Sequence, residues 1–413
     1  MNNIFSKNEI RLLELITGSF SDNKTEKKAA GYDIKEVFSI ALHHGILPVI
    51  YKKIKEEDLS GEEREILEAS VKTTASDFFN LSMTARRITS LFKKEGINAV
   101  ILKGASIARF YPVPESRRSK DIDILLADPE NVKKAESVLI EAGFKRTEKE
   151  YNANHHEVWG TPDNHVLELH TILVEPFDDK GFNDYINKRY ILREEDILHE
   201  KVLGIELPML FDDRLAFHLL LHMMMDFYRH GFGLKLLCDW VAFWNRDVKE
   251  DQIKNFLSDV EKCGQKGFLS VVTSTCIRYL GLKRENGCTL NIDNDKIIYA
   301  GGTFCALADE KICEDFLYDI IDTERNGKPD DERMVAMKNT GFMALVKEFH
   351  HQTKLYYPKA SKAIITLPVL YVIVFVRFLI NNKRVRGGAK LSSIVKEADR
   401  RSRLLRRINE TEG

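Results

Sequence analysis

Apolar residues near the start of the chain recur with the spacing of amphipathic helices. Two short runs cover residues 10–16 and 34–42, and a longer run covers residues 67–92. Within each run the apolar positions return to one side after three or four residues, which is the period of an α-helix. No alternation typical of a strand interrupts them, so we predict an N-terminal helical region over residues 1–95.

The pattern changes to short strands alternating with helices between residues 96 and 207. Apolar or alternating runs at residues 99–102, 121–126, 144–149, 155–159 and 165–170 are typical of strands. Helical segments begin at Ala105 and Pro129, and Asp128 is placed to cap the second of them. Helical periodicity returns over residues 208–360. The predicted fold class is therefore α+β, with a small mixed β-sheet core of four or five strands flanked by N-terminal and C-terminal helical regions.

The last part of the chain, residues 361–413, combines an apolar segment with a basic tail. Residues 364–376 are almost continuously apolar but fall short of the ~18 to 20 residues needed to span a bilayer, which favours a buried or interfacial segment. Between residues 383 and 407, ten Lys or Arg side chains stand against Glu397 and Asp399, so this stretch carries +8 and the rest of the chain −9. An apolar stripe beside these charges suits an anionic bilayer, the acidic body of the protein or a partner, and a solvated tail is the alternative.

Composition narrows the class of protein only a little. With 413 residues, 44% hydrophobic and 30% charged, the chain has the makeup of a globular protein of two or three domains. A net charge of −1 argues against a long nucleic acid as partner, because phosphate neutralisation requires a basic surface. Six cysteines show neither a Cys-x-x-Cys pair nor zinc-ligand spacing, and the N-terminus lacks an apolar signal core. We therefore expect a cytoplasmic protein, with peripheral membrane contact through residues 364–408 as an option.

Asp121 and Asp123 supply the main chemical signal of the sequence. Side chains two apart on a strand share a face, so both carboxylates occupy one small volume and require neutralisation, for which Mg²⁺ with oxygen ligands is suited. Glu168 alternates with Leu167 and Leu169 on a later strand. If the two strands pair, the three carboxylates can hold two Mg²⁺ ions ~3.5 to 4 Å apart, as displacement at phosphorus requires. The alternative is an exposed strand edge that carries solvated acids.

Basic and histidine residues accompany these carboxylates in the sequence. Lys103 and Gly104 follow the strand at residues 99–102, where glycine lets backbone N–H groups approach a phosphate. We expect Lys103 to contact a phosphate or, without nucleotide, to pair with the carboxylates. Arg117 precedes the Asp-x-Asp strand and is expected to meet a triphosphate or the acidic cluster, or else to form a structural salt bridge. His170 either hydrogen-bonds in the surroundings of Glu168 or packs as a satisfied ring.

These motifs resemble the nucleotidyltransferase superfamily that includes DNA polymerase beta, in which a glycine after a strand is followed by Asp-x-Asp and a later carboxylate. A closer resemblance is to the bacterial family called the uncharacterised nucleotidyltransferases. It is carried by Leu102-Lys103-Gly104, Arg117, Asp121-Ile122-Asp123-Ile124-Leu125, Leu167-Glu168-Leu169-His170 and Leu236-Leu237-Cys238-Asp239. Gly104-Ala105 departs from the Gly-Ser or Gly-Gly common in the superfamily, with Ser106 one position late.

The resemblance implies Mg²⁺-dependent transfer of a nucleoside monophosphate from an NTP, foremost ATP, to an acceptor hydroxyl, with release of pyrophosphate. The residues implied to bind two metal ions and carry catalysis are Asp121, Asp123 and Glu168. Those implied to hold the nucleotide are Lys103, Gly104, Ser106, Arg117 and Asp239. The expected partners are the nucleoside triphosphate and a small-molecule or protein acceptor.

The sequence leaves alternatives open for the role of Asp239 and for the function of the protein. In the resembling family the helix through Asp239 covers the nucleotide, where this carboxylate orients a base or an acceptor, or simply pairs with Lys235. The altered Gly104-Ala105 turn suits a catalytically inactive protein that binds nucleotide without turning it over. The basic tail suits a membrane-surface or protein-interaction module in which the acidic cluster has no catalytic role.

Overall fold

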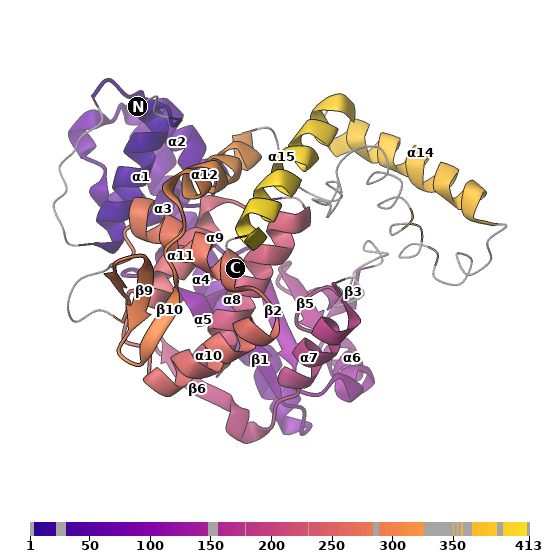
Figure 1. Ribbon diagram of the computed structural model, residues 1–413. Helices are drawn as coiled ribbons and strands as arrows, with labels where there is room; N and C mark the ends of the chain where they lie inside the picture. The colour runs from indigo at the N-terminus through magenta and orange to yellow at the C-terminus, as the bar shows by residue number, and fades with distance from the viewer. Residues whose placement is uncertain are drawn as a thin grey trace.

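The computed structural model describes residues 4–21, 30–147, 156–177, 179–229, 231–283, 289–325, 366–385 and 391–410, with the single positions 350, 353 and 357. Helices come first, as the apolar spacing predicts. They are α1 (Lys7–Phe20), α2 (Ile34–His43), α3 (Leu47–Ile50) and the 34-residue α4 (Gly61–Lys94) (Figure 1). Ser60 caps α4, because its hydroxyl accepts from the Glu63 N–H at 3.3 Å and its own N–H donates to the Glu63 carboxylate at 2.7 Å.

A seven-stranded mixed sheet follows, in the order β3-β4-β5-β2-β1-β7-β6. Its strands are β1 (Ala99–Ile101), β2 (Asp121–Leu126), β3 (Lys145–Arg146), β4 (His156–Gly160), β5 (Val166–His170), β6 (Ile197–Val202) and β7 (Ile205–Leu210). β2 pairs parallel with β5 and antiparallel with β1, while β1 pairs parallel with β7. The connecting helices are α5 (Ala105–Ala108), α6 (Val132–Glu141) and α7 (Lys180–Arg189). The predicted α+β class with a mixed sheet is confirmed.

The hairpin of β6 and β7 makes the sheet larger than the predicted four or five strands. The middle of β6 is exposed and polar, and β7 contains Pro208, so neither gives a clear apolar alternation. Leu203 and Gly204 form the turn with φ angles of +47° and +84°, as a two-residue hairpin requires. The strand pairing therefore depends on the turn and on neighbouring β1 more than on the pattern within each strand.

Helices dominate the part of the chain after this sheet. They are α8 (Asp212–Arg229), α9 (Leu234–Trp244), α10 (Glu250–Lys262), α11 (Lys266–Tyr279) and α12 (Glu310–Arg325). A small antiparallel sheet interrupts them, formed by β8 (Asn291–Asp293), β9 (Lys296–Tyr299) and β10 (Gly302–Ala306). The sequence analysis gives helical periodicity over residues 208–360 and no strand there, because strands this short offer too few positions to display a period.

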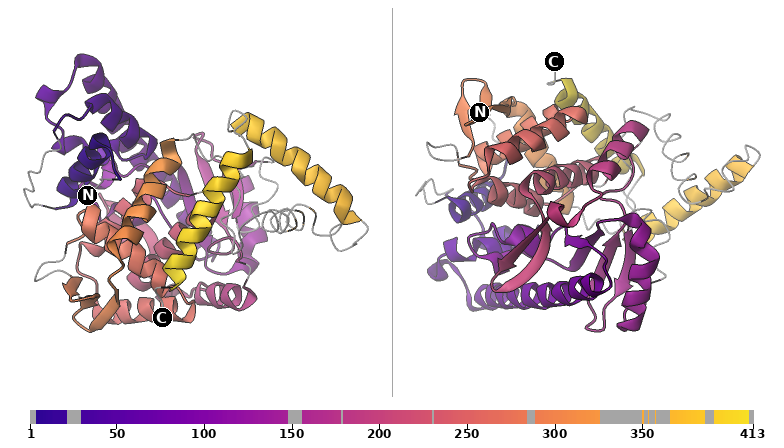
Figure 2. Two further views of the ribbon diagram at one scale, coloured as in Figure 1. Left: turned by 45° about the horizontal axis from the view of Figure 1, so that its top comes forward. Right: turned by 90° about the horizontal axis from the view of Figure 1, so that it is seen from below.

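Two apolar clusters hold the large sheet between helices. The smaller lies between one face of the sheet and helices α4 and α6, and includes Ile101 and Ile124. The larger covers the other face, extends through α1, α2, α8, α9 and α11, and includes Leu102 and Leu125. Successive residues of a strand therefore reach opposite clusters. Figure 2 shows α4 running along one face of the sheet. The division of the chain at residues 95, 207 and 360 stays a prediction.

The basic tail forms α15 (Leu391–Glu410), which packs on α11 and α12. Its buried apolar side chains are Leu404, Leu405 and Ile408. Arg400 and Arg401 both bind the buried Asp319 of α12, with closest distances of 2.5 and 2.6 Å. The alternative of a solvated tail is wrong for the described part of this helix, since Arg400, Arg401 and Arg407 pair with acids of α12 and its apolar side chains are buried.

The apolar segment forms α14 (Leu367–Val385), which extends outward from the rest of the molecule in Figure 1. Its exposed large apolar side chains are Val369, Val372, Ile373, Phe375 and Val376. Across the parts of the chain described above, no helix has the length and apolar character needed to cross a membrane.

Candidate active site

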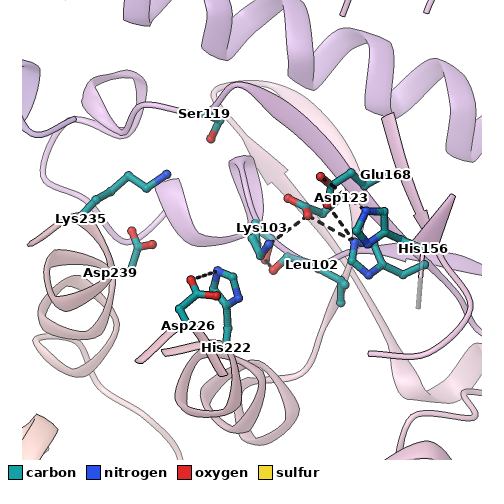
Figure 3. A network of polar contacts seen from close by, with 12 residues as sticks. Leu102, Lys103, Ser119, Asp123, His156, Glu168, His222, Asp226, Lys235 and Asp239 are labelled. Atoms are coloured by element: carbon teal, nitrogen blue, oxygen red, sulfur yellow. Dashed lines mark hydrogen bonds and ion pairs between the residues drawn. The ribbon is translucent and has the colours of Figure 1, made fainter. Parts of the chain in front are cut away.

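The pairing of β2 with β5 brings predicted metal ligands together. In the parallel register Asp121 lies opposite Val166, and Asp123 lies opposite Glu168. Asp121 and Asp123 are two apart on one strand and therefore share a face. The Nε2 atom of His170 lies 3.4 Å from Asp123 Oδ1 and 3.5 Å from Glu168 Oε2, so two carboxylates from neighbouring strands flank one ring nitrogen. Figure 3 shows the Asp123 and Glu168 side chains converging.

Lys103 places a positive charge on this acidic cluster. The backbone N–H of Leu102 donates to the carbonyl of Asp123 at 3.0 Å, and the next residue directs its Nζ to Asp123 Oδ1 at 3.1 Å. Burial alone would lower the pKa of Lys103, but the charges of Asp123, Asp121 and Glu168 raise it above its ordinary value. The ammonium group thus occupies the position of a counter-cation beside the carboxylates.

Burial acts in the same direction on the two aspartates, but their pKa values shift in opposite directions. Burial and the neighbouring charge of Asp123 raise the pKa of Asp121. Burial would also raise the pKa of Asp123, yet the charge of Lys103 and the hydrogen bond from His170 hold it well below its ordinary value. Asp123 is therefore the more acidic member of the pair, and the negative charge of Asp121 is the less well compensated of the two.

The turn after β1 contains Gly104 and Ser106, and the two residues have different surroundings. Gly104 has φ +60° and ψ −121°, a conformation that side chains rarely adopt, and it precedes the four-residue helix α5. It lines the space beside Asp121 and Asp123. Ser106 is fully buried and its hydroxyl donates to the carbonyl of Leu102 at 3.4 Å. Gly104 is thus at the site, whereas the Ser106 hydroxyl is directed to the backbone.

Arg117 and Asp239 form a buried ion pair with each other, so neither side chain is exposed to a ligand. The guanidinium donates from Nε to Asp239 Oδ1 at 2.7 Å and from Nη2 to Oδ2 at 2.8 Å, and the Tyr111 hydroxyl donates to the same Oδ1 at 2.6 Å. Arg117 is 2% exposed and Asp239 is 0% exposed. The structural salt bridge expected as the alternative for Arg117 is present, and its partner is Asp239 instead of Glu115 or Asp128, the acids nearby in the sequence. Asp239 thus binds Arg117, whereas the sequence suggests Lys235 as its partner.

Two histidines stand beside Glu168. His156 Nε2 lies 4.0 Å from Glu168 Oε1, and the rings of His156 and His170 are 5.0 Å apart. Burial lowers the pKa of His156 to about 4, which keeps its ring neutral. Burial opposes the charge on His170 as well, but its hydrogen bonds to Asp123 and Glu168 raise its pKa. Adjacent strand residues face opposite sides, so the sequence allows one member of the His155-His156 pair here, and residue 155 lies outside the described residues.

A small recess that opens to solvent adjoins the carboxylates. One wall comes from α4, with the side chains Phe78, Leu81, Ser82 and Ala85. The other side carries Gly104, Ser119 and Asp121, among others. In the sequence these α4 residues are ordinary positions of an apolar helix face, and Ser82 is the polar one among the four. Their place at the site becomes visible when α4 packs on the sheet.

Lys235 on α9 lies across this site from Lys103. Its Nζ is 3.5 Å from the backbone carbonyl of Arg118, and Figure 3 shows the amine directed toward Ser119. Burial and the charge of Arg117 lower the pKa of Lys235. The sequence suggests Lys235 only as a partner of Asp239, because its approach to the loop before β2 depends on the packing of α9.

The site thus combines carboxylates from two neighbouring strands, a lysine that neutralises part of their charge and a glycine turn. The sequence profile of the family described as "Uncharacterised nucleotidyltransferase" matches residues 31–281, more than half of the chain. The chain belongs to this family. No curated protein matches it.

Several solved structures resemble parts of the chain. The lincosamide antibiotic adenylyltransferase LnuA, bound to lincomycin, is 14% identical over 43% of this chain and 94% of its own, with a TM-score of 0.24. The antibiotic-resistance factor ANT(2'')-Ia is 11% identical over 50% of this chain and 96% of its own, with a TM-score of 0.27. An antigenic nucleotidyltransferase-like protein from Paracoccidioides brasiliensis is 14% identical over 44% of this chain and 88% of its own, with a TM-score of 0.28.

Proposed function

We propose that this protein transfers a nucleoside monophosphate from an NTP, foremost ATP, to an acceptor hydroxyl and releases pyrophosphate. The observation that carries the proposal is the convergence of Asp123 and Glu168 from paired strands, with Lys103 as counter-charge. Family membership supports the reaction class. Asp121, Asp123 and Glu168 would hold two Mg²⁺ ions, and these three oxygen-donor side chains fit that cation.

Residues around the carboxylates have separate roles in this proposal. Bound Mg²⁺ would supply charge neutralisation at the reacting phosphorus. Lys103 would move from Asp123 toward the phosphates when cations take its place, and the backbone at Gly104 would approach them closely. Lys235 would contact the phosphates from the opposite side, the role predicted for Arg117. Glu168 would accept the proton of the acceptor hydroxyl, and His170 would orient that carboxylate.

The recess beside α4 is proposed to receive either the base or the acceptor. Phe78, Leu81 and Ala85 supply an apolar wall, while Ser82 and Ser119 supply hydroxyl groups. A concave apolar surface with a few polar groups suits a small organic ligand. The proposed acceptor is accordingly a small molecule or a protein side chain that presents one hydroxyl.

Label transfer tests the proposal directly. The full-length protein would be incubated with Mg²⁺, each α-³²P-labelled NTP and panels of small hydroxyl compounds and proteins, and both labelled product and pyrophosphate would be measured. We expect label transfer by the wild type, a fall of at least about a hundredfold in Asp123→Asn, and little change in Asp128→Asn, whose side chain caps a short helix elsewhere. Equal background in the wild type and Asp123→Asn would overturn the enzymatic proposal.

The inactive nucleotide-binding alternative gives a different result. Both an enzyme and a binder should be stabilised against thermal unfolding by Mg²⁺ with an NTP, and Asp121→Asn should remove that shift in either case. Only the enzyme releases pyrophosphate. A shift without pyrophosphate release across the acceptor panel favours the binder, and no shift with any NTP contradicts both.

Peripheral membrane contact is a second proposed function. We assign it to α14, because Arg400, Arg401 and Arg407 of α15 pair with acids of α12. Val369, Val372, Ile373 and Val376 are exposed at helical spacing, and basic residues follow in the sequence from Arg377. The proposed partner is an anionic bilayer surface. The protein should sediment with phosphatidylserine-containing vesicles and less with phosphatidylcholine alone, and Val372→Asp should reduce binding several-fold. Equal sedimentation of the wild type and Val372→Asp would contradict this role.

A further inference from the structure

We propose that His156, Glu168 and His170 form a binding site for a first-row transition-metal dication beside the carboxylates of β2. Each of the three residues offers one ligand atom, and these atoms all lie within 4.8 Å of one another. The inference rests on the proposed function in one respect, because Glu168 serves both sites. It adds a second kind of ion to the site, with ligands that Mg²⁺ does not favour.

The distances are close to those around a single ion. His170 Nε2 lies 3.5 Å from Glu168 Oε2, and His156 Nε2 lies 4.0 Å from Glu168 Oε1. Nitrogen and oxygen ligands bind such ions at about 2.0–2.2 Å, which places pairs of ligand atoms about 3–4 Å apart. The three ligand atoms must therefore draw closer on binding, since they lie within 4.8 Å of one another before an ion is bound.

The strands hold these ligands in place before an ion binds. β4 and β5 are antiparallel, and in their register His156 lies directly opposite His170. Glu168 is two residues before His170 on the same strand and thus shares its face. All three ligands come from the middle or ends of paired strands, and rigid elements of this kind fix ligand geometry more closely than loops do.

Burial leaves a way in for the ion on the carboxylate side. The side chains of His156 and His170 are 10% and 4% exposed, whereas that of Glu168 is 23% exposed. An ion entering from the Glu168 side would meet two imidazoles behind it and keep open positions toward solvent. A site with protein ligands on one side and open positions on the other is typical of catalytic metals, which bind substrate or water there.

The ligand types select the ion. Imidazole nitrogen suits zinc, cobalt, nickel and iron, whereas carboxylate and water oxygens suit magnesium and calcium. Asp121 and Asp123 offer oxygen alone, and the cluster around His156 offers two nitrogens with one carboxylate. Asp123 Oδ1 lies 3.4 Å from His170 Nε2, so the two sites adjoin through these residues. The structure thus assigns a hard cation to the aspartates and a transition metal to the histidines.

Cobalt binding tests the inference without any turnover. The full-length protein, stripped of metal and free of nucleotide, would be titrated with Co²⁺ and its visible absorption followed, with Zn²⁺ and Mg²⁺ as competitors. We expect one equivalent of Co²⁺ to bind, Zn²⁺ to displace it, and millimolar Mg²⁺ to leave it in place. His156→Gln and His170→Gln should each weaken Co²⁺ binding at least about tenfold. His199→Gln, on an exposed strand residue, is the matched control and should bind as the wild type does.

The outcomes separate this inference from the proposed function. Equal Co²⁺ affinity of the wild type and both site variants, or displacement by stoichiometric Mg²⁺, would overturn the metal site. If that happened while Mg²⁺-dependent label transfer persisted, the proposed function would stand alone. Tight Co²⁺ binding that depends on His156 supports the site, and it does so even where no acceptor receives label. Circular dichroism of each variant would establish that a loss of Co²⁺ absorption does not result from unfolding.

Discussion

Arg117 and Asp239 stand 122 positions apart in the sequence and form a fully buried, two-pronged ion pair, with distances of 2.7 and 2.8 Å. Arg117 lies just before β2, and Asp239 lies in the middle of α9. The pair therefore connects the loop that leads into β2, the Asp-x-Asp strand, to α9, a helix of the larger apolar cluster. We expect this pair to position the acidic strand, whereas the sequence predicts a nucleotide contact for both residues.

Replacing Asp239 by asparagine should leave the Arg117 charge buried without its counter-ion. The removal of one partner of a buried pair costs about 3–5 kcal/mol, so the free energy of unfolding in urea should fall by that order. The matched control is Glu68→Gln, which removes the exposed pair with Lys72 and should change the free energy by less than about 1 kcal/mol. Similar midpoints for Asp239→Asn and the control would contradict the positioning role.

Asp319 should hold α15 on the body of the protein. It is 1% exposed and accepts from both Arg400 and Arg401, so Asp319→Asn removes the shared counter-ion of two arginines. Hydrogen exchange of amides in residues 399–410 should quicken by at least about tenfold. Asp322→Asn, which removes a 3.2 Å contact to Arg400, should have a smaller effect. The same protection in both variants would count against this attachment.

Gly104 should not tolerate alanine, for reasons of backbone conformation. A Cβ at this position would meet only the Ser119 hydroxyl at 3.9 Å, so space is available, but φ +60° is strained for any side chain. We expect Gly104→Ala to destabilise the protein by about 1–3 kcal/mol and to reduce activity. Gly61→Ala at the start of α4, with no contact within 4 Å and no positive φ, should be neutral or mildly stabilising. Thermal unfolding of the two variants makes the comparison.

His218 gives the protein a pH-dependent stability. Burial lowers its pKa to about 3, from an ordinary value of 6.5, so the unfolded chain binds a proton that the folded chain does not. Stability from this group is present above pH 6.5 and is lost as the pH falls toward 3. Between pH 6 and 4 the free energy of unfolding should fall less steeply in His218→Gln than in the wild type, by about 1.4 kcal/mol per pH unit. Parallel pH profiles would contradict the assignment.

The sequence predicts the elements of the site better than their surroundings. Asp121, Asp123 and Glu168 lie in strands with period-2 alternation, and that period alone fixes which side chains share a face. The pairing of β2 with β5, which the sequence offers only as a condition, is present in the structure. Lys103 is likewise adjacent in sequence to a strand, and its contact with Asp123 is the alternative expected in the absence of nucleotide.

Tertiary packing decides the features that the sequence leaves open. Arg117 and Asp239 are each visible as unusual charges, but no local pattern indicates that they pair. The +8 tail is compatible with several partners, and Asp319 becomes its partner only because α12 packs beneath α15. His156 stands in a weak strand and becomes a candidate ligand only when β4 pairs with β5. Such contacts depend on chain segments that lie far apart in the sequence.

The crystal structure of the protein soaked with Mn²⁺ and a non-hydrolysable triphosphate analogue is the most direct test of the proposed site. Mn²⁺ reports on cation positions by anomalous scattering. The account predicts an ion at about 2.0–2.3 Å from carboxylate oxygens of both Asp121 and Asp123, with the Lys103 amine moved to the phosphates. An analogue bound elsewhere, or no ion at these two aspartates while Lys103 stays on Asp123, would contradict it.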